Sequence, residues 1–282
     1  DPSARSLVTL SNTLFSLRDY SRGEEIMKLA FKKMDLTETK PSITSHKFNP
    51  VQTYDFLKYI MSELEKFDLK PFLAFGTLLG MVRDGKIFDH DKDSDIGIFD
   101  IDQDDLEHII YKLCNGTRVI SPDMVKKDKS LRKDYITLFD QTTGSCVDIF
   151  VFRNAGPTVT CSLDSLYGPF KWTYEAFEVV NRSFGSDNFY VPSDCDKFLT
   201  ETYSAEWVNE VTLYDGLMES PNICESSKRS AIAFASMRAA DCYLKGKIAK
   251  SLYYFEHANR RGCDYHAIVK KLEDLKSKDS IE

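Results

Sequence analysis

Four aspartates at every second position, Asp89, Asp91, Asp93 and Asp95, stand directly before the apolar run Ile96–Phe99. In an extended strand, side chains alternate between the two faces, so this period predicts four carboxylates on one side. Such crowding of negative charge calls for a counter-cation, and carboxylate oxygens are ligands that Mg²⁺ prefers. The spacing therefore predicts a divalent-metal site at the edge of a strand, and the alternative is a solvated acidic loop.

A further carboxylate, Asp148, interrupts the apolar run Cys146–Phe152. Burial of a lone carboxylate costs free energy unless the group is paired or binds a metal, so we predict that Asp148 is a third metal ligand. The alternative is an aspartate that points outward from a half-exposed strand, which the alternation of side chains along a strand also allows.

Two segments have residue types that suit a phosphate. Gly76 and Thr77 follow the apolar run Phe72–Phe75, and a glycine at such a turn lets backbone N–H groups approach a phosphate closely. Further along, five positive charges, including Lys129 and Arg132, lie within the eight residues 126–133. We expect this basic segment to hold the phosphates of an anionic donor, and the alternative is a solvated loop.

The composition excludes several classes of protein. The chain has 282 residues, of which 42% are hydrophobic, so it can form one large or two modest folded domains. A net charge of −7 argues against a nucleic-acid binder. The chain also lacks an apolar run of the roughly 20 residues that a membrane span requires.

The cysteines and the N-glycosylation sequons bear on the cellular compartment in which the protein is expected. Seven cysteines are scattered without a C-x-x-C pair, which argues against a zinc ribbon or a dense disulfide framework and predicts free, mostly buried thiols. We therefore expect a cytoplasmic enzyme. The sequons at Asn115 and Asn181 leave the lumen of the secretory pathway as the alternative. A chain that begins with Asp1 is also consistent with a piece of a longer protein.

Apolar periodicity predicts the elements that must position these residues. We expect a helical hairpin and linker over residues 1–50, a catalytic domain over 51–220 and a helical segment over 221–282. Within the catalytic domain we expect a helix, strands around residues 72 and 96, a second helix, a hairpin over 135–152 and a helix capped by Ser193. The spacing of Ala239, Gly246 and Phe255 loosely resembles a tetratricopeptide helix pair. Plain amphipathic helices are the alternative.

Several motifs follow one another in a definite order. They are Gly76–Gly80, Arg83, the block Phe88–Gly97, Val147–Phe150, and a closing set made of Val191, Pro192, Leu199, Tyr203 and Trp207. This ordered set, between Tyr54 and Trp207, resembles the LicD/fukutin family of phospho-group transferases. The chain departs from that pattern at Asp89-His90, where the family usually has Pro-Trp, and at Lys92, where it has an acidic residue.

The resemblance implies a fold and a set of site residues. The fold is α+β, a nucleotidyltransferase-type small mixed sheet flanked by helices, to which this chain adds helical hairpins at both termini. Asp93, Asp95 and Asp148 are expected to be catalytic and to bind Mg²⁺ or Mn²⁺. Gly76, Thr77, Arg83, Lys129 and Arg132 are expected to bind the substrate, with Arg83 as a phosphate clamp. As general base we rank Asp148 first, with Asp91 and His90 as alternatives.

The resemblance also implies an activity. We expect a metal-dependent transferase that moves phosphocholine, ribitol phosphate, glycerol phosphate or a similar group from a CDP-type donor to a glycan acceptor. One alternative is a nucleotidyltransferase acting on a sugar phosphate or a protein. The other is a catalytically dead interaction module that binds a protein partner through its terminal helices.

Overall fold

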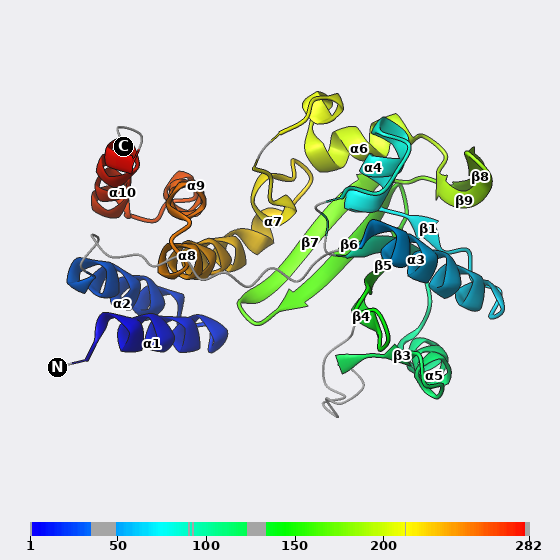
Figure 1. Ribbon diagram of the computed structural model, residues 1–282, viewed down its shortest axis with the longest axis horizontal. Coiled ribbons are helices and arrows are strands. Elements are labelled where there is room, and N and C mark those ends of the chain that lie inside the picture. The colour runs from blue at the N-terminus through cyan, green and yellow to red at the C-terminus, as the bar shows by residue number, and fades with distance from the viewer. Residues whose placement is uncertain are drawn as a thin grey trace.

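A mixed sheet flanked by helices forms one side of the computed structural model, and helices from both ends of the chain lie together on the other side (Figure 1). The structure describes residues 2–34, 49–89, 91, 93–122, 134–211 and 213–279. This arrangement confirms the predicted α+β class with terminal helical hairpins, although the sheet, with nine strands in the described ranges, is larger than expected.

Three strands in the middle of the sheet position the candidate site. β2 (Ser94–Phe99) pairs antiparallel with β1 (Phe72–Leu73) and parallel with β5 (Cys146–Ala155). Most side chains of these central strands are buried, as expected for strands covered on both faces, and this burial explains their continuous apolar runs. The strand order is β3-β4-β5-β2-β1-β9-β8, and β6 and β7 continue from β5.

The remaining strands include the predicted hairpin and four that the sequence reading did not identify. They are β3 (Val119–Ile120), β4 (Tyr135–Asp140), β6 (Thr158–Ser165), β7 (Gly168–Glu175), β8 (Val179–Phe184) and β9 (Asp187–Pro192). Along β7, Phe170, Trp172 and Tyr174 are buried while the residues between them are exposed or half-buried. This period of two was the signal for a strand in that segment.

Several helices lie around the sheet. Most of them begin where a short polar side chain caps them, whereas the helix that follows Ala74 has no side-chain cap. These helices are α3 (Pro50–Glu65), α4 (Phe75–Arg83), α5 (Gln103–Cys114), α6 (Cys195–Tyr203) and α7 (Gly216–Glu219), with short 3₁₀ turns η2 (Ala205–Val208) and η3 (Glu225–Ser227). The predicted cap Ser193 is wrong by one residue. The Asp194 carboxylate accepts the Lys197 N–H at 2.9 Å and so caps α6.

Helices from the two ends of the chain pack against each other. They are α1 (Ala4–Ser16), α2 (Tyr20–Lys33), α8 (Lys228–Leu244), α9 (Ile248–Arg260) and α10 (His266–Asp279). Both α1 and α2 contact α8 (Figure 1). The ring of Phe31, on α2, lies 5.3 Å from that of Tyr243 and 4.8 Å from that of Phe255. Segments expected as separate additions therefore form one helical bundle.

The ribbon of β6 and β7 joins this bundle to the sheet. The Tyr20 hydroxyl donates to the Tyr167 carbonyl at 3.0 Å. Gly168 follows at φ +138°, and a Cβ at this position would lie 1.9 Å from the Ser230 Oγ. Only glycine accepts both this backbone angle and this close approach, so the tip of the ribbon is seated directly on α8.

Two further expectations concern the state of the cysteines and helices that could span a membrane. All seven cysteines are free thiols, and most of them are buried, as predicted. Within the described ranges, no helix carries an apolar stretch long enough to cross a bilayer.

The bundle can be tested through Phe31, which is 1% exposed between α2, α8 and α9. We predict that Phe31→Ala lowers the free energy of unfolding by about 3–5 kcal/mol, because it leaves a cavity between helices from both ends of the chain. Leu17→Ala is the control, since this leucine is 70% exposed and its loss should change stability by less than about 0.5 kcal/mol. Urea unfolding measures both, and equal stabilities would contradict the packing.

Candidate active site

The four aspartates Asp89, Asp91, Asp93 and Asp95 do not lie on one strand. Because β2 begins at Ser94, only Asp95 lies in it, and the expected strand alternation of all four carboxylates is wrong. Asp89 is exposed and pairs with Lys86 at 2.7 Å, away from the cavity that the other three line. Asp91 and Asp93 lie between Asp89 and the strand and line that cavity together with Asp95.

Asp95 and Asp148 are direct neighbours across parallel strands. They are partners in the register between β2 and β5, so both side chains are on the same face of the sheet. Asp148 is only 7% exposed, which contradicts an outward-facing side chain. Its Oδ2 accepts the Tyr135 hydroxyl at 2.7 Å, and the Cys146 Sγ lies 3.8 Å from its Oδ1. These contacts orient the Asp148 carboxylate.

The first turn of α4 holds Asp95 on the other side. The Gly76 N–H donates to the Asp95 Oδ2 at 3.2 Å, and the Thr77 hydroxyl accepts the Asp95 N–H at 2.7 Å. A Cβ at position 76 would lie 2.9 Å from the Asp91 Oδ2, so glycine leaves room for this carboxylate. The Gly-Thr pair is therefore a helix N-terminus that carries its own carboxylate partner, rather than a turn between two strands.

Like charge dominates the electrostatics of these groups. The pKa of Asp95 is raised well above its ordinary value. The largest cause is the loss of hydration on burial, and the smaller causes are the negative charges of Asp93, Asp91 and Asp148. Burial raises the pKa of Asp148 to about 6, although the hydrogen bond from Tyr135 lowers it. Negative charge gathered in this way favours a cation or an electropositive ligand group beside it.

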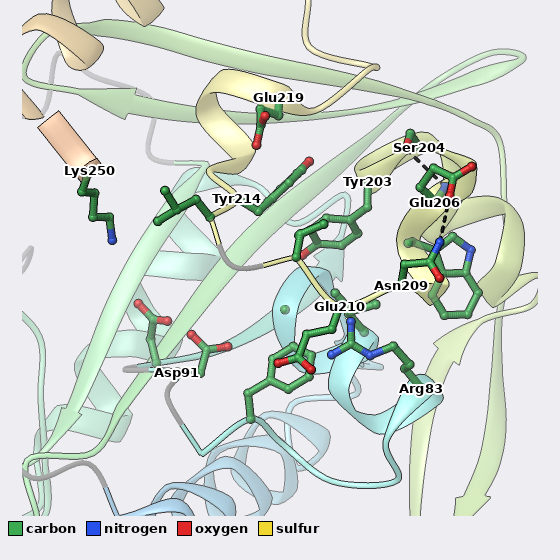
Figure 2. A pocket seen from close by; sticks show the side chains of 17 residues that line it. Arg83, Asp91, Tyr203, Ser204, Glu206, Asn209, Glu210, Tyr214, Glu219 and Lys250 are labelled. Carbon is green, nitrogen blue, oxygen red and sulfur yellow. Dashed lines mark hydrogen bonds between the residues drawn. The ribbon is translucent and has the colours of Figure 1, made fainter. Parts of the chain in front are cut away.

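Two adjoining cavities meet at the aspartates. The first, which we call the carboxylate cavity, has a volume of about 470 Å³ and is lined by Asp91, Asp93, Asp95 and Asp148. The second, the aromatic cavity, has a volume of about 630 Å³ and is lined by Tyr203, Trp207 and Tyr214 with several polar side chains (Figure 2). The residues that line both are Gly76, Asp91, Asp93, Tyr203, Tyr214 and Lys250.

The predicted substrate-binding residues occupy different places. Gly76 lines both cavities, whereas Thr77 is buried beneath them and is 2% exposed. Arg83 lines the aromatic cavity, but its guanidinium bonds to Asp84 at 2.9 Å and lies over the Phe88 ring. Lys129 and Arg132, together with His90 and Lys92, lie outside the described residues.

Residues from beyond the matched motifs also line the site, and the sequence reading did not propose them. Arg238 of α8 and Lys250 and Tyr254 of α9 face the carboxylate cavity, together with Asp215 at the start of α7. Single charged residues in amphipathic helices have no local pattern that distinguishes them from solvated ones. Only the packing of the helical bundle brings these residues to the aspartates.

A divalent cation fits the donor chemistry of the site, because the groups that converge on the carboxylate cavity are oxygen ligands. Among the described side chains, however, no three of His, Cys, Asp or Glu stand in positions that would already hold a metal ion. Binding of Mg²⁺ or Mn²⁺ by Asp93, Asp95 and Asp148 therefore stays a prediction.

Comparison with known proteins identifies a family that matches the central region and a relative of the chain. Residues 68–194 match the family described as LicD/FKTN/FKRP, nucleotidyltransferase domain. A protein of Rickettsia prowazekii (strain Madrid E), described as uncharacterized, is 27% identical over 165 residues. That match covers 57% of this chain and 57% of the relative, so the chain spans little more than half of the relative's length. The resemblance to tetratricopeptide helices finds no support in these matches.

The role of Thr77 in holding the strand can be tested by paired substitutions. We predict that Thr77→Val lowers the free energy of unfolding by about 1–3 kcal/mol, because the Asp95 N–H loses its acceptor in a buried place. Thr77→Ser keeps the hydroxyl and should retain most of that stability. Urea unfolding compares the two, and a valine variant as stable as the serine variant would show that this hydrogen bond contributes little.

Proposed function

Because the central part of the chain, residues 68–194, belongs to the LicD/FKTN/FKRP family of nucleotidyltransferase domains, we propose that the protein transfers a phosphorylated alcohol or sugar. The donor is nucleotide-activated and of the CDP type, and the acceptor is a hydroxyl group of a glycan. The transferred group belongs to the class of phosphocholine, ribitol phosphate and glycerol phosphate. The observation that carries the proposal is the cross-strand pair Asp95 and Asp148 at the base of a cavity that Asp91 and Asp93 also line.

The reaction exchanges one phosphoester bond for another without oxidation or reduction. The acceptor oxygen forms a bond to the phosphorus that carries the alcohol, and the bond from this phosphorus to the bridging oxygen breaks. The nucleoside monophosphate leaves with that oxygen, and the hydroxyl proton passes to a base. Such a transfer depends mainly on positioning and on neutralising the negative charge of the donor. The rigid sheet supplies the positioning, and the fixed carboxylates would supply the neutralisation only through a cation that they hold.

Asp93, Asp95 and Asp148 would hold Mg²⁺ or Mn²⁺, which when bound neutralises charge on the donor diphosphate. The hydrogen bonds from Gly76 and Tyr135 orient two of these carboxylates before any ligand arrives. Asp148 remains our first choice for the base. Asp91 is the alternative, because it lies where the two cavities meet.

The aromatic cavity suits the glycan acceptor. Tyr203, Trp207 and Tyr214 offer ring faces, and Asn209 and Glu206 add groups that hydrogen-bond to hydroxyls. Figure 2 shows the labelled side chains of Tyr203, Glu206, Asn209 and Tyr214 around one hollow, with Asp91 at its edge. An acceptor in this cavity would present its hydroxyl toward the aspartates, and the donor would occupy the carboxylate cavity.

The products identify the reaction. We predict that the protein, incubated with a CDP-alcohol, a glycan acceptor and Mg²⁺ or Mn²⁺, releases CMP and that EDTA stops the release, because the cation must offset the carboxylate charges. Chromatography of the nucleotides measures this. Pyrophosphate released from a nucleoside triphosphate would instead indicate nucleotidyl transfer. An absence of nucleotide binding with either metal would favour the interaction module.

Substitution of Asp95 should separate catalysis from stability. We predict that Asp95→Asn lowers turnover by about 100-fold or more. In EDTA, the variant should melt at a temperature equal to or above that of the wild type, because the substitution removes one of several crowded negative charges. Asp89→Asn is the matched control, since Asp89 is exposed and contacts Lys86 outside the cavity. It should keep full turnover. Full turnover by the Asp95 variant would remove this residue from the site.

A further inference from the structure

We propose that Lys250, on helix α9 of the C-terminal bundle, binds the phosphate group that is transferred. This inference rests on the proposed function and adds to it a phosphate ligand from outside the matched region 68–194. Lys250 lines both cavities, as do Asp91 and Asp93. Figure 2 shows its side chain extending from α9 into the hollow, on the side where Asp91 lies. The ammonium therefore stands at the junction where donor and acceptor must meet.

The other described cations of the two cavities are already engaged. Arg83 forms two hydrogen bonds with Asp84, at 2.9 and 3.2 Å. Arg238 lies over the rings of Phe234 and Tyr254, at 5.9 and 5.7 Å. Both arginines thus lie over aromatic rings, whereas Lys250 has no such ring contact and forms no hydrogen bond or ion pair with another described residue. Its ammonium is thus available to a ligand.

Contacts on either side of Lys250 set the position of its backbone. The Ser251 hydroxyl donates to the Ala239 carbonyl at 2.8 Å and ties α9 to α8. The Tyr254 hydroxyl donates to the Asp215 Oδ2 at 2.7 Å, and Asp215 caps α7 through the Leu217 N–H at 3.0 Å. Two of these residues, Asp215 and Tyr254, line the carboxylate cavity themselves. The helix that carries Lys250 is therefore anchored to the wall of the site.

The chemistry of the cavity indicates an anion with several negative charges as the ligand. A lysine ammonium is a compact point charge with three donors and is well suited to a phosphate oxygen. The facing aspartates would repel a bare phosphate, so the anion binds together with a divalent cation, between carboxylates and ammonium. A diphosphate with its cation meets this requirement. The structural alternative is that Lys250 only offsets the charge of Asp215, whose pKa it lowers against the larger effect of burial.

Binding of inorganic pyrophosphate in the presence of Mg²⁺ tests the inference without requiring turnover. We expect calorimetry to show binding to the full chain, and Lys250→Met to raise the Kd by about 10-fold or more. Lys250→Arg should retain part of the affinity. Lys247→Met is the matched control, because Lys247 is an exposed lysine near the start of the same helix and lines neither cavity. It should bind as the wild type does.

Two results would overturn the inference. One is an unchanged Kd in Lys250→Met, with or without a lower melting temperature, which would leave this residue a structural role only. The other is a wild-type chain that does not bind pyrophosphate with Mg²⁺. Failure of the proposed function looks different: CDP-alcohols would yield no CMP, while pyrophosphate binding would still depend on Lys250.

Discussion

The candidate site depends on several negatively charged carboxylates that are held close together in the middle of a sheet. Asp95 and Asp148 are neighbours across β2 and β5. The negative charges of Asp93 and Asp91 help to raise the pKa of Asp95. Rigid strands, the Gly76 N–H and the Tyr135 hydroxyl hold these carboxylates in place. Such an arrangement lowers stability and is retained where a ligand or a cation completes it, so it marks the site more clearly than any cavity does.

The helical bundle is the second part on which the site depends. Helices α1 and α2 pack on α8, the ribbon of β6 and β7 connects the bundle to the sheet, and α7 and α9 close the wall of the cavities. Helices α8 and α9, from the C-terminal end, thus contribute side chains directly to the cavities, while α1 and α2, from the N-terminal end, pack on α8 behind them. Their arrangement also explains why α9 can bring Lys250 to the junction of the two cavities.

A local sequence pattern predicts the structure correctly where the pattern has one physical cause. Asp148 within an apolar run indicates a buried, partnered carboxylate, and the structure shows one that is 7% exposed and bonded to Tyr135. Local patterns that conflict led to wrong predictions. The alternation from Asp89 to Asp95 has the period of a strand, but the strand begins only at Ser94. Between residues 158 and 192, frequent turns obscured the alternation of four strands.

Local sequence specifies the order of the elements, the family motifs of residues 68–194 and the central aspartates, because periodicity and side-chain chemistry act over a few neighbouring residues. Tertiary structure alone decides that Asp95 faces Asp148, that Thr77 supports the strand rather than lining a cavity, and that the two ends of the chain share one bundle. It also decides which lysine reaches the site. Contacts of this kind join residues far apart in the chain, and they follow from how whole elements pack, which a local pattern does not encode.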